Sequence, residues 1–175
     1  MVPNRLVLAP MTNRQSPLDG CLSKVEADWL RMRADGGFGI VTTCATAVNI
    51  EALTWDGQLA LWCDAQADAL KLLPPLLAPS GALGIVQLFH GGLRAKPEIS
   101  GIQTVSASPP EGEFGRWREA SEPDIERIID DFVSAAIRAS DAGMDGVEIH
   151  GAHGYLPAQF LSVTENRRTD RWGGE

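Results

Sequence analysis

Four short apolar segments, each bounded by polar or glycine-rich turns, constrain the fold of this chain more than any other feature. Their apolar character is continuous rather than alternating, which is typical of parallel strands that are covered on both faces. We expect strands at residues 5–11, 38–48, 82–90 and 145–151.

Helical patterns separate these strands. Ser23 and Glu26 have the spacing of a capping box, and apolar residues then recur at helical spacing as far as Gly36. Another helix is expected from Ser121 to Gly143, with a continuous apolar stripe on one face. Strands and helices therefore alternate along the chain.

The segments between the second strand and this last helix are less regular. Residues 64–81 should form a helix that stops near Leu73, because Pro74 and Pro75 lack the backbone donors that a helix interior needs. The connection at residues 91–120 is longer than an ordinary loop, so it is either a functional excursion or disordered.

The alternation of strands and helices predicts an α/β protein with a parallel sheet, and both a doubly wound sheet and a barrel fit it. In either fold the active site gathers at the carboxyl ends of the strands. The residues found there are Pro10, Met11 and Thr12 after the first strand, Ala45 after the second, Gln87 and His90 late in the third, and His150, His153 and Tyr155 after the fourth.

The composition is that of a single acidic globular domain. The chain has 175 residues, of which 44% are hydrophobic and 22% charged, and its formal net charge is −8. That charge argues against a nucleic-acid or anionic-membrane partner, because both need a basic surface. Three cysteines without a close pair, and no apolar leader or membrane span, predict reduced thiols and a cytoplasmic location.

Gln87 lies within an apolar strand, where its amide needs hydrogen-bond partners. A planar ligand with adjacent donor and acceptor atoms would satisfy it, and so would neighbouring backbone groups.

The two histidines at 150 and 153 allow three interpretations. They could bind zinc, although no third ligand stands nearby in a typical pattern. They could donate paired hydrogen bonds to a substrate oxygen, with Tyr155 as proton donor. They could also be loop histidines that are satisfied locally.

The last motif of the chain is long and specific. Together with three earlier segments it resembles the amino-terminal half of the Old Yellow Enzyme family, the FMN-dependent NAD(P)H:flavin oxidoreductases. The segments are NRLVLAPMTN (4–13), TTCATAV (42–48), VQLFHGG (86–92) and GVEIHGAHGYLPAQFLSVTENRRTDRWGGE (146–175). The resemblance implies a (β/α)₈ TIM barrel that carries FMN on its carboxyl face. The flavin is reduced by NAD(P)H and reoxidised by an activated alkene.

The resemblance also implies roles for individual residues. Pro10, Met11 and Thr12 would line the flavin, with the Thr12 hydroxyl near the C4 carbonyl, and Ala45 would contact the ring through its backbone. Gln87 would bind the flavin N3–H and C2 carbonyl with its side-by-side acceptor and donor.

For the substrate, the resemblance implies that His150 and His153 hold a carbonyl or nitro oxygen while Tyr155 protonates the α-carbon. Thr12 is a departure, since the family often combines a His/His pair with cysteine at that position. The subgroup and the redox tuning are therefore open.

The length is the larger departure, because a barrel of this type needs about 250 residues and 175 residues supply about four β/α units. We expect residues 1–175 to be the first half of one FMN-binding barrel domain, with the remainder absent. Its two open sheet edges predict a homo-oligomer or a complementary half-barrel as partner. A catalytically silent half-barrel that only associates is the alternative function, and a zinc-dependent barrel hydrolase is a minor one.

Overall fold

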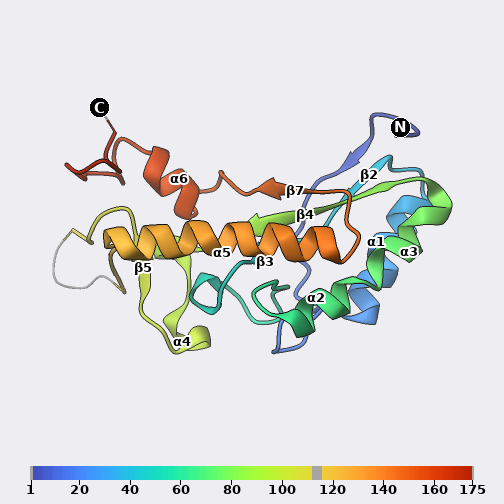
Figure 1. Cartoon of the computed structure of the whole chain (residues 1–175), viewed down its shortest axis with the longest axis horizontal. Coiled ribbons are helices and arrows are strands. Elements are labelled where there is room, and N and C mark those ends of the chain that lie inside the picture. Colours follow the sequence, from blue (N-terminus) through green and yellow to red (C-terminus); the bar gives the residue numbers. More distant parts are fainter. Residues whose placement is uncertain (1, 112–115, 175) are drawn as a thin grey trace.

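A computed structural model describes residues 2–111 and 116–174 of the protein (Figure 1). All strand pairs of its main sheet are parallel, and the spatial order of the four principal strands follows their order in the chain. The strands are β1 (Val7–Leu8), β2 (Ile40–Thr42), β4 (Leu83–Phe89) and β7 (Gly146–Ile149), with a short β3 (Thr46–Ala47) that pairs with the carboxyl end of β4.

Helices connect the strands in the expected rhythm. Ser23 caps the first helix by accepting a hydrogen bond from the Glu26 N–H at 3.1 Å, and Ser121 caps the long helix through a full capping box with Asp124. The helices are α1 (Lys24–Asp35), α2 (Asp64–Leu70), α3 (Leu73–Leu77), α4 (Pro97–Ser100), α5 (Glu122–Asp141) and α6 (Leu156–Leu161), with 3₁₀ turns η1 (Ile50–Ala52), η2 (Ala78–Ser80) and η3 (Gly92–Arg94).

The central strand β4 separates the two sides of the sheet. Val86 and Leu88 are fully buried in the core that the helices form with the sheet. Gln87 and Phe89 point to the opposite side, since successive side chains of a strand alternate, and Phe89 belongs to a separate cluster with Tyr155. The second side is the one that faces the interior of a barrel.

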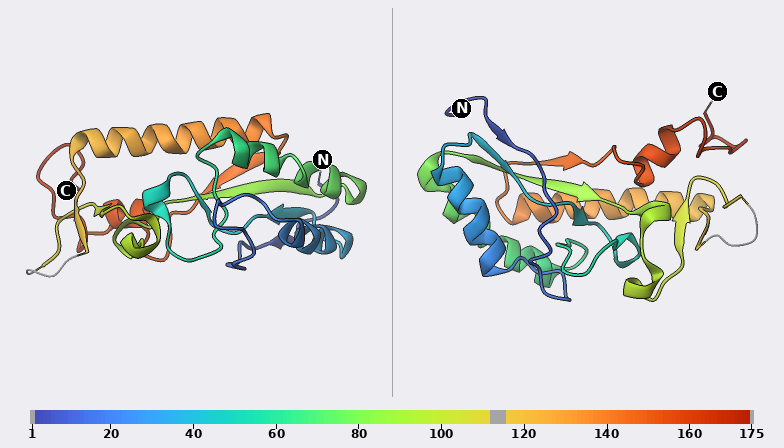
Figure 2. Two further views of the ribbon diagram at one scale, coloured as in Figure 1. Left: turned by 90° about the horizontal axis from the view of Figure 1, so that it is seen from below. Right: turned by 180° about the vertical axis from the view of Figure 1, so that it is seen from behind.

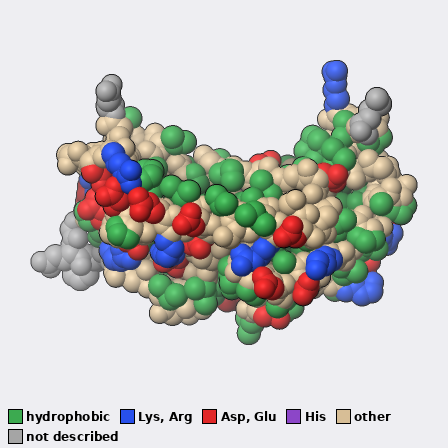
Figure 3. All heavy atoms as spheres, in the orientation of Figure 1, with side chains coloured by type: hydrophobic (Ala, Val, Ile, Leu, Met, Phe, Trp, Pro, Cys, Tyr) green, Lys and Arg blue, Asp and Glu red, His purple; other side chains and the backbone are tan. Residues whose placement is uncertain are grey.

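Helix α5 runs along β4 and β7 on the outer side of the sheet (Figure 2). The other elements of the chain cover only part of the apolar stripe of α5. Ile125 and Ile128 are buried, whereas Ile129 and Val133 are 45% and 53% exposed. On the adjoining outer face of β7, Ile149 is 54% exposed. Figure 3 shows hydrophobic side chains gathered along this strip between α5 and β7.

The predicted strands exist but are shorter than expected. The first is reduced to two residues, and the second is interrupted at residues 43–45 before it resumes as β3. At this break the Thr43 hydroxyl accepts a hydrogen bond from the Gln87 N–H at 3.2 Å. The hydroxyl thus serves as the acceptor that a backbone carbonyl would supply in a regular parallel sheet. The interruption lies at the carboxyl end of the sheet.

The two prolines do not act as predicted. The helix at residues 64–81 ends earlier, at Leu70, and Pro74 and Pro75 lie in the first turn of a new helix, α3. Proline is tolerated there because the first-turn N–H groups have no partner within a helix.

The excursion at residues 91–120 is ordered where the structure describes it. Strand β5 (Thr104–Ser106) pairs with β6 (Trp117–Glu119) in a small parallel sheet of its own. Residues 112–115, which belong to the same predicted excursion, lie outside the described residues. None of the helices in the described part of the chain is long and apolar enough to cross a membrane.

Candidate active site

Three aromatic side chains meet where β7 ends and α6 begins. The ring centroids of His150 and His153 are 5.2 Å apart, and the Tyr155 ring lies 4.9 Å from His150 and 6.2 Å from His153. The turn between them is tight, with His153 and Gly154 both in the left-handed region at φ 56° and 68°. Local geometry thus brings together the three residues that the sequence nominates for substrate binding.

His150 is held in one tautomer. Its Nδ1 accepts a hydrogen bond from the Ala152 N–H at 3.3 Å, so the proton of the neutral ring is on Nε2. Burial, followed by the charge of the neighbouring His153, lowers the pKa of His150 below its ordinary value. At neutral pH this ring is therefore uncharged and can donate a hydrogen bond from Nε2.

The loop that carries Tyr155 is fixed by the end of β4. The Leu156 N–H donates to the His90 carbonyl at 3.0 Å, and the Gln159 amide donates to the Gly154 carbonyl at 2.7 Å. The Tyr155 ring packs edge-on against Phe89, with centroids 4.4 Å apart. The phenol is half-buried and is held in place by these contacts.

Gln87 is buried on the inner face of β4, where its strand neighbour is Glu148 of β7. Its Nε2 donates to Glu148 Oε1 at 2.5 Å. This contact orients the amide, and one N–H and the carbonyl oxygen remain for a planar ligand. Local sequence patterns assign Glu148 no role, because the pairing joins residues that are 61 positions apart.

Ala45 lies in the same inner cluster as Trp55, Phe89 and Tyr155. Its carbonyl accepts a hydrogen bond from the Gln58 amide at 3.1 Å. Gln58 is a buried residue that sequence reasoning missed, and its only sequence signal is a polar amide in a tight turn. Any contact of Ala45 with a ring would thus come from a backbone that Gln58 holds in place.

Pro10, Met11 and Thr12 follow β1, which is separated from β4 by β2. Pro10 is half-buried, whereas Met11 and Thr12 are exposed. The three residues lie at the same carboxyl end of the sheet as Gln87, but they do not belong to the aromatic cluster of Tyr155.

His90 turns away from this cluster. It is fully buried, its Nδ1 accepts from the Gly92 N–H at 3.1 Å, and its Nε2 lies 3.6 Å from Glu51 Oε1, beyond a normal hydrogen bond. Glu51 in turn accepts a hydrogen bond from Arg127 of α5 at 2.6 Å. The Glu51–Arg127 pair therefore lies next to the buried His90 ring, whose Nε2 has no hydrogen-bond partner among the described residues.

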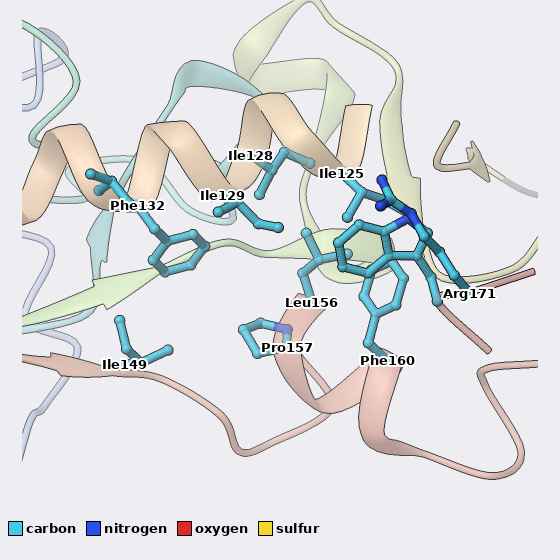
Figure 4. A pocket seen from close by; sticks show the side chains of 11 residues that line it. Ile125, Ile128, Ile129, Phe132, Ile149, Leu156, Pro157, Phe160 and Arg171 are labelled. Atoms are coloured by element: carbon cyan, nitrogen blue, oxygen red, sulfur yellow. The ribbon is translucent and has the colours of Figure 1, made fainter. Parts of the chain in front are cut away.

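Within residues 2–111 and 116–174, no group of three or more His, Cys, Asp or Glu side chains is placed to hold a metal ion. A prominent hollow of the described chain lies away from the histidines. It is an apolar groove of about 490 Å³ on the outer side of β7 (Figure 4), which we call the α5 groove. Its lining includes Ile125, Ile129, Phe132, Ile149, Phe160 and Trp172.

Comparison with known proteins decides the family. The model of the NADH:flavin oxidoreductase / NADH oxidase family, whose members use FMN, matches residues 1–175. The chain belongs to this family. Membership confirms the expected resemblance to the Old Yellow Enzyme family, a family of oxidoreductases that use FMN and NAD(P)H.

The relatives agree in sequence and in fold. The probable NADH-dependent flavin oxidoreductase YqiG of Bacillus subtilis is 38% identical over 175 residues, which are 99% of this chain and 47% of that protein. NADH:acrylate oxidoreductase of Vibrio harveyi is 36% identical over 98% of this chain and 17% of its own length. The structure of the old yellow enzyme homologue from Zymomonas mobilis superposes with a TM-score of 0.92 at 31% identity, and the match covers 99% of this chain and 52% of that one.

These matches confirm the first half of a TIM barrel as the fold class. The chain spans about half the length of the Bacillus protein and of the Zymomonas structure.

Proposed function

We propose that this chain is the amino-terminal half of an FMN-dependent ene-reductase, which transfers hydride from NAD(P)H through the flavin to the β-carbon of an activated alkene such as an enone. The observation that carries the proposal is the cluster of two imidazoles and one phenol beside Gln87 and Ala45. The name of the Vibrio relative, an acrylate oxidoreductase, supports an activated alkene as the substrate class.

The inner face of the sheet suits the isoalloxazine ring. Gln87 offers an oriented amide to N3–H and the C2 carbonyl, Ala45 offers a fixed backbone, and the Thr12 hydroxyl would reach the C4 carbonyl from the β1 side. Pro10 and Met11 would complete the apolar lining. When bound, FMN supplies the hydride chemistry that no side chain of this protein can perform.

The protein residues then divide the remaining work. His150 donates from Nε2, and His153 stands 5.2 Å away to bind the same substrate oxygen, so the pair stabilises the negative charge that develops there. Polarising the oxygen makes the β-carbon electrophilic. Tyr155, at 4.9 Å from the His150 ring, delivers a proton to the α-carbon.

The partner that completes this site is a complementary half-barrel. Strand β7 is an edge of the described sheet, and the α5 groove beside it is an apolar surface that suits the apolar side chains of an amphipathic helix. In a right-handed β–α–β crossover the helix that follows a strand packs on that outer face before the next parallel strand pairs with the edge. The Zymomonas structure, of which the chain covers 52%, is long enough to contain such units.

A second copy of this chain fits the groove less well, because each copy carries a formal charge of −8. The alternative function, a catalytically silent half-barrel that only associates with a partner, would use the same groove. The two proposed functions therefore differ only in whether the flavin site is used.

The test combines the chain with a polypeptide that corresponds to the second half of the Bacillus relative. The proposal expects a yellow complex that reduces an enone with NADH or NADPH, and a complex with His150→Ala and His153→Ala that stays yellow but loses enone reduction. A stable colourless complex would support the silent half-barrel. Zinc in the complex without flavin would support the hydrolase.

A further inference from the structure

Glu26, in the first turn of α1, is a carboxylate without any exposed surface. Its Oε1 accepts hydrogen bonds from Asn13 Nδ2 at 2.9 Å and from Cys44 Sγ at 3.1 Å. Its Oε2 accepts from Ser16 Oγ at 3.0 Å. All three donors are uncharged, and none of them belongs to α1.

The position of Glu26 in the sequence predicts that its carboxylate caps the start of α1. A glutamate three residues after an N-cap serine normally returns its carboxylate to the N-cap N–H. Here Ser23 accepts from the Glu26 N–H, but the Glu26 carboxylate points inward to Asn13, Ser16 and Cys44. Burial of a carboxylate is costly unless it is hydrogen-bonded, and the positive end of the helix dipole also favours it in the first turn.

The donors come from the two loops that carry proposed flavin contacts. Asn13 directly follows Thr12 in the loop after β1, and Cys44 directly precedes Ala45 at the break after β2. Asn13 also accepts from the Gln15 N–H at 3.1 Å, which closes the first loop on itself. One side chain thus joins two loops from neighbouring strands.

We propose that Glu26 is a positioning residue that fixes Thr12 and Ala45 relative to each other, so that FMN meets a preformed pair of contacts. The inference rests on the proposed flavin site. It is separate from the catalytic roles of His150 and Tyr155, because Glu26 reaches the flavin only through its neighbours.

Two substitutions separate positioning from burial. Glu26→Gln keeps the shape, its carbonyl can accept from Asn13 and Cys44, and its amide can donate to the Ser16 hydroxyl, which is also an acceptor. Glu26→Leu removes every acceptor. Ser23→Ala is the matched control, since it removes the cap of the same helix and leaves the loop contacts in place.

The first measurement uses the chain alone and needs no flavin. Amide hydrogen exchange should be about tenfold faster or more at residues 10–16 and 43–47 in Glu26→Leu, and within about threefold of the unsubstituted chain in Glu26→Gln. Ser23→Ala should accelerate exchange only in the first turn of α1. If Glu26→Leu does not fold, Ser16→Ala removes only the hydroxyl that donates to Glu26 and should accelerate exchange at residues 10–16.

The second measurement uses the complex with the complementary half. Glu26→Leu should raise the dissociation constant for FMN about tenfold or more, whereas Glu26→Gln and Ser23→Ala should leave it within about threefold. Equal effects of Glu26→Leu and Ser23→Ala on loop exchange and on FMN binding would overturn the inference. Absence of FMN from the unsubstituted complex would instead overturn the proposed function, and the exchange data would still decide whether Glu26 holds the loops.

Discussion

The imidazole of His150 and the phenol of Tyr155 meet edge to face, with ring centroids 4.9 Å apart. In the function that we propose, this relationship places a hydrogen-bond donor for a substrate oxygen beside a proton donor for the neighbouring carbon. Both groups stand at the carboxyl end of the sheet, where parallel α/β folds collect their ligands.

Replacing both His150 and His153 by Ala should abolish the binding of phenol-like ligands to the flavin-loaded complex. Their oxygen is expected between the two rings, and their ring should stack on the flavin. A titration followed by the visible flavin spectrum checks this. An unchanged spectral response in the double variant would remove the pair as an oxygen clamp.

The pKa of His150 should rise when His153 is replaced by Ala. The sign follows from the structure, because the neighbouring imidazole disfavours a positive charge on His150 and so lowers its pKa. Burial remains in the variant, so the value should stay below that of a free imidazole. An NMR titration of the His150 ring measures the shift, and a lower pKa in the variant would contradict this account of the cluster.

Glu51→Gln should reduce the dependence of stability on acid pH. Burial raises the pKa of Glu51, but contacts with His90 and Arg127 outweigh it and leave the pKa lowered. A lowered carboxyl pKa adds stability above the ordinary value of 4.5, which is lost as the pH falls through the lowered value. At pH 7 the variant should lose about 1–3 kcal/mol in denaturant unfolding.

The control for Glu51 is Glu126→Gln, which removes an exposed partner of Arg171. Exposed ion pairs contribute about 0–1 kcal/mol, so this variant should keep the stability and the acid dependence of the unsubstituted chain. An equal loss of unfolding free energy in both variants would show that the contacts of Glu51 contribute no more to stability than an exposed ion pair does.

The chain alone should purify largely colourless and self-associate. Family resemblance puts the phosphate contacts on later strands, and charge-assisted contacts are worth about 1.5–3 kcal/mol each.

Exposed Ile129 and Val133 should drive self-association of the chain, so the double variant Ile129→Lys with Val133→Lys should associate less in sedimentation experiments. The control variant Val25→Lys, on the exposed face of α1, should associate as much as the unsubstituted chain. A monomeric chain with stoichiometric FMN would contradict both expectations.

The sequence predicts well what local patterns encode. The bounds of α1 and α5 follow from their caps and glycines, and the aromatic cluster follows from a motif in which His150, His153 and Tyr155 lie within one turn. Continuous apolar strands likewise indicated a parallel sheet. In each case the residues that determine the feature are near neighbours in the chain.

What the sequence could not predict depends on distant partners. Glu26 has the pattern of a cap, but donors 10 to 18 positions away determine where its carboxylate points. Gln58 and Glu148 acquire their contacts with Ala45 and Gln87 only once the strands pair. Such contacts are set by packing, and no local periodicity reports them.

The most direct test of the proposed mechanism is the Tyr155→Phe variant in the flavin-loaded complex, studied by stopped-flow absorbance. Only the oxidative half-reaction needs the proton, so flavin reduction by NAD(P)H should stay nearly unchanged. Alkene reduction should slow about 10²–10⁴-fold, the usual effect of losing one positioned general acid. Equal slowing of both half-reactions, or of neither, would contradict the role of Tyr155 as proton donor.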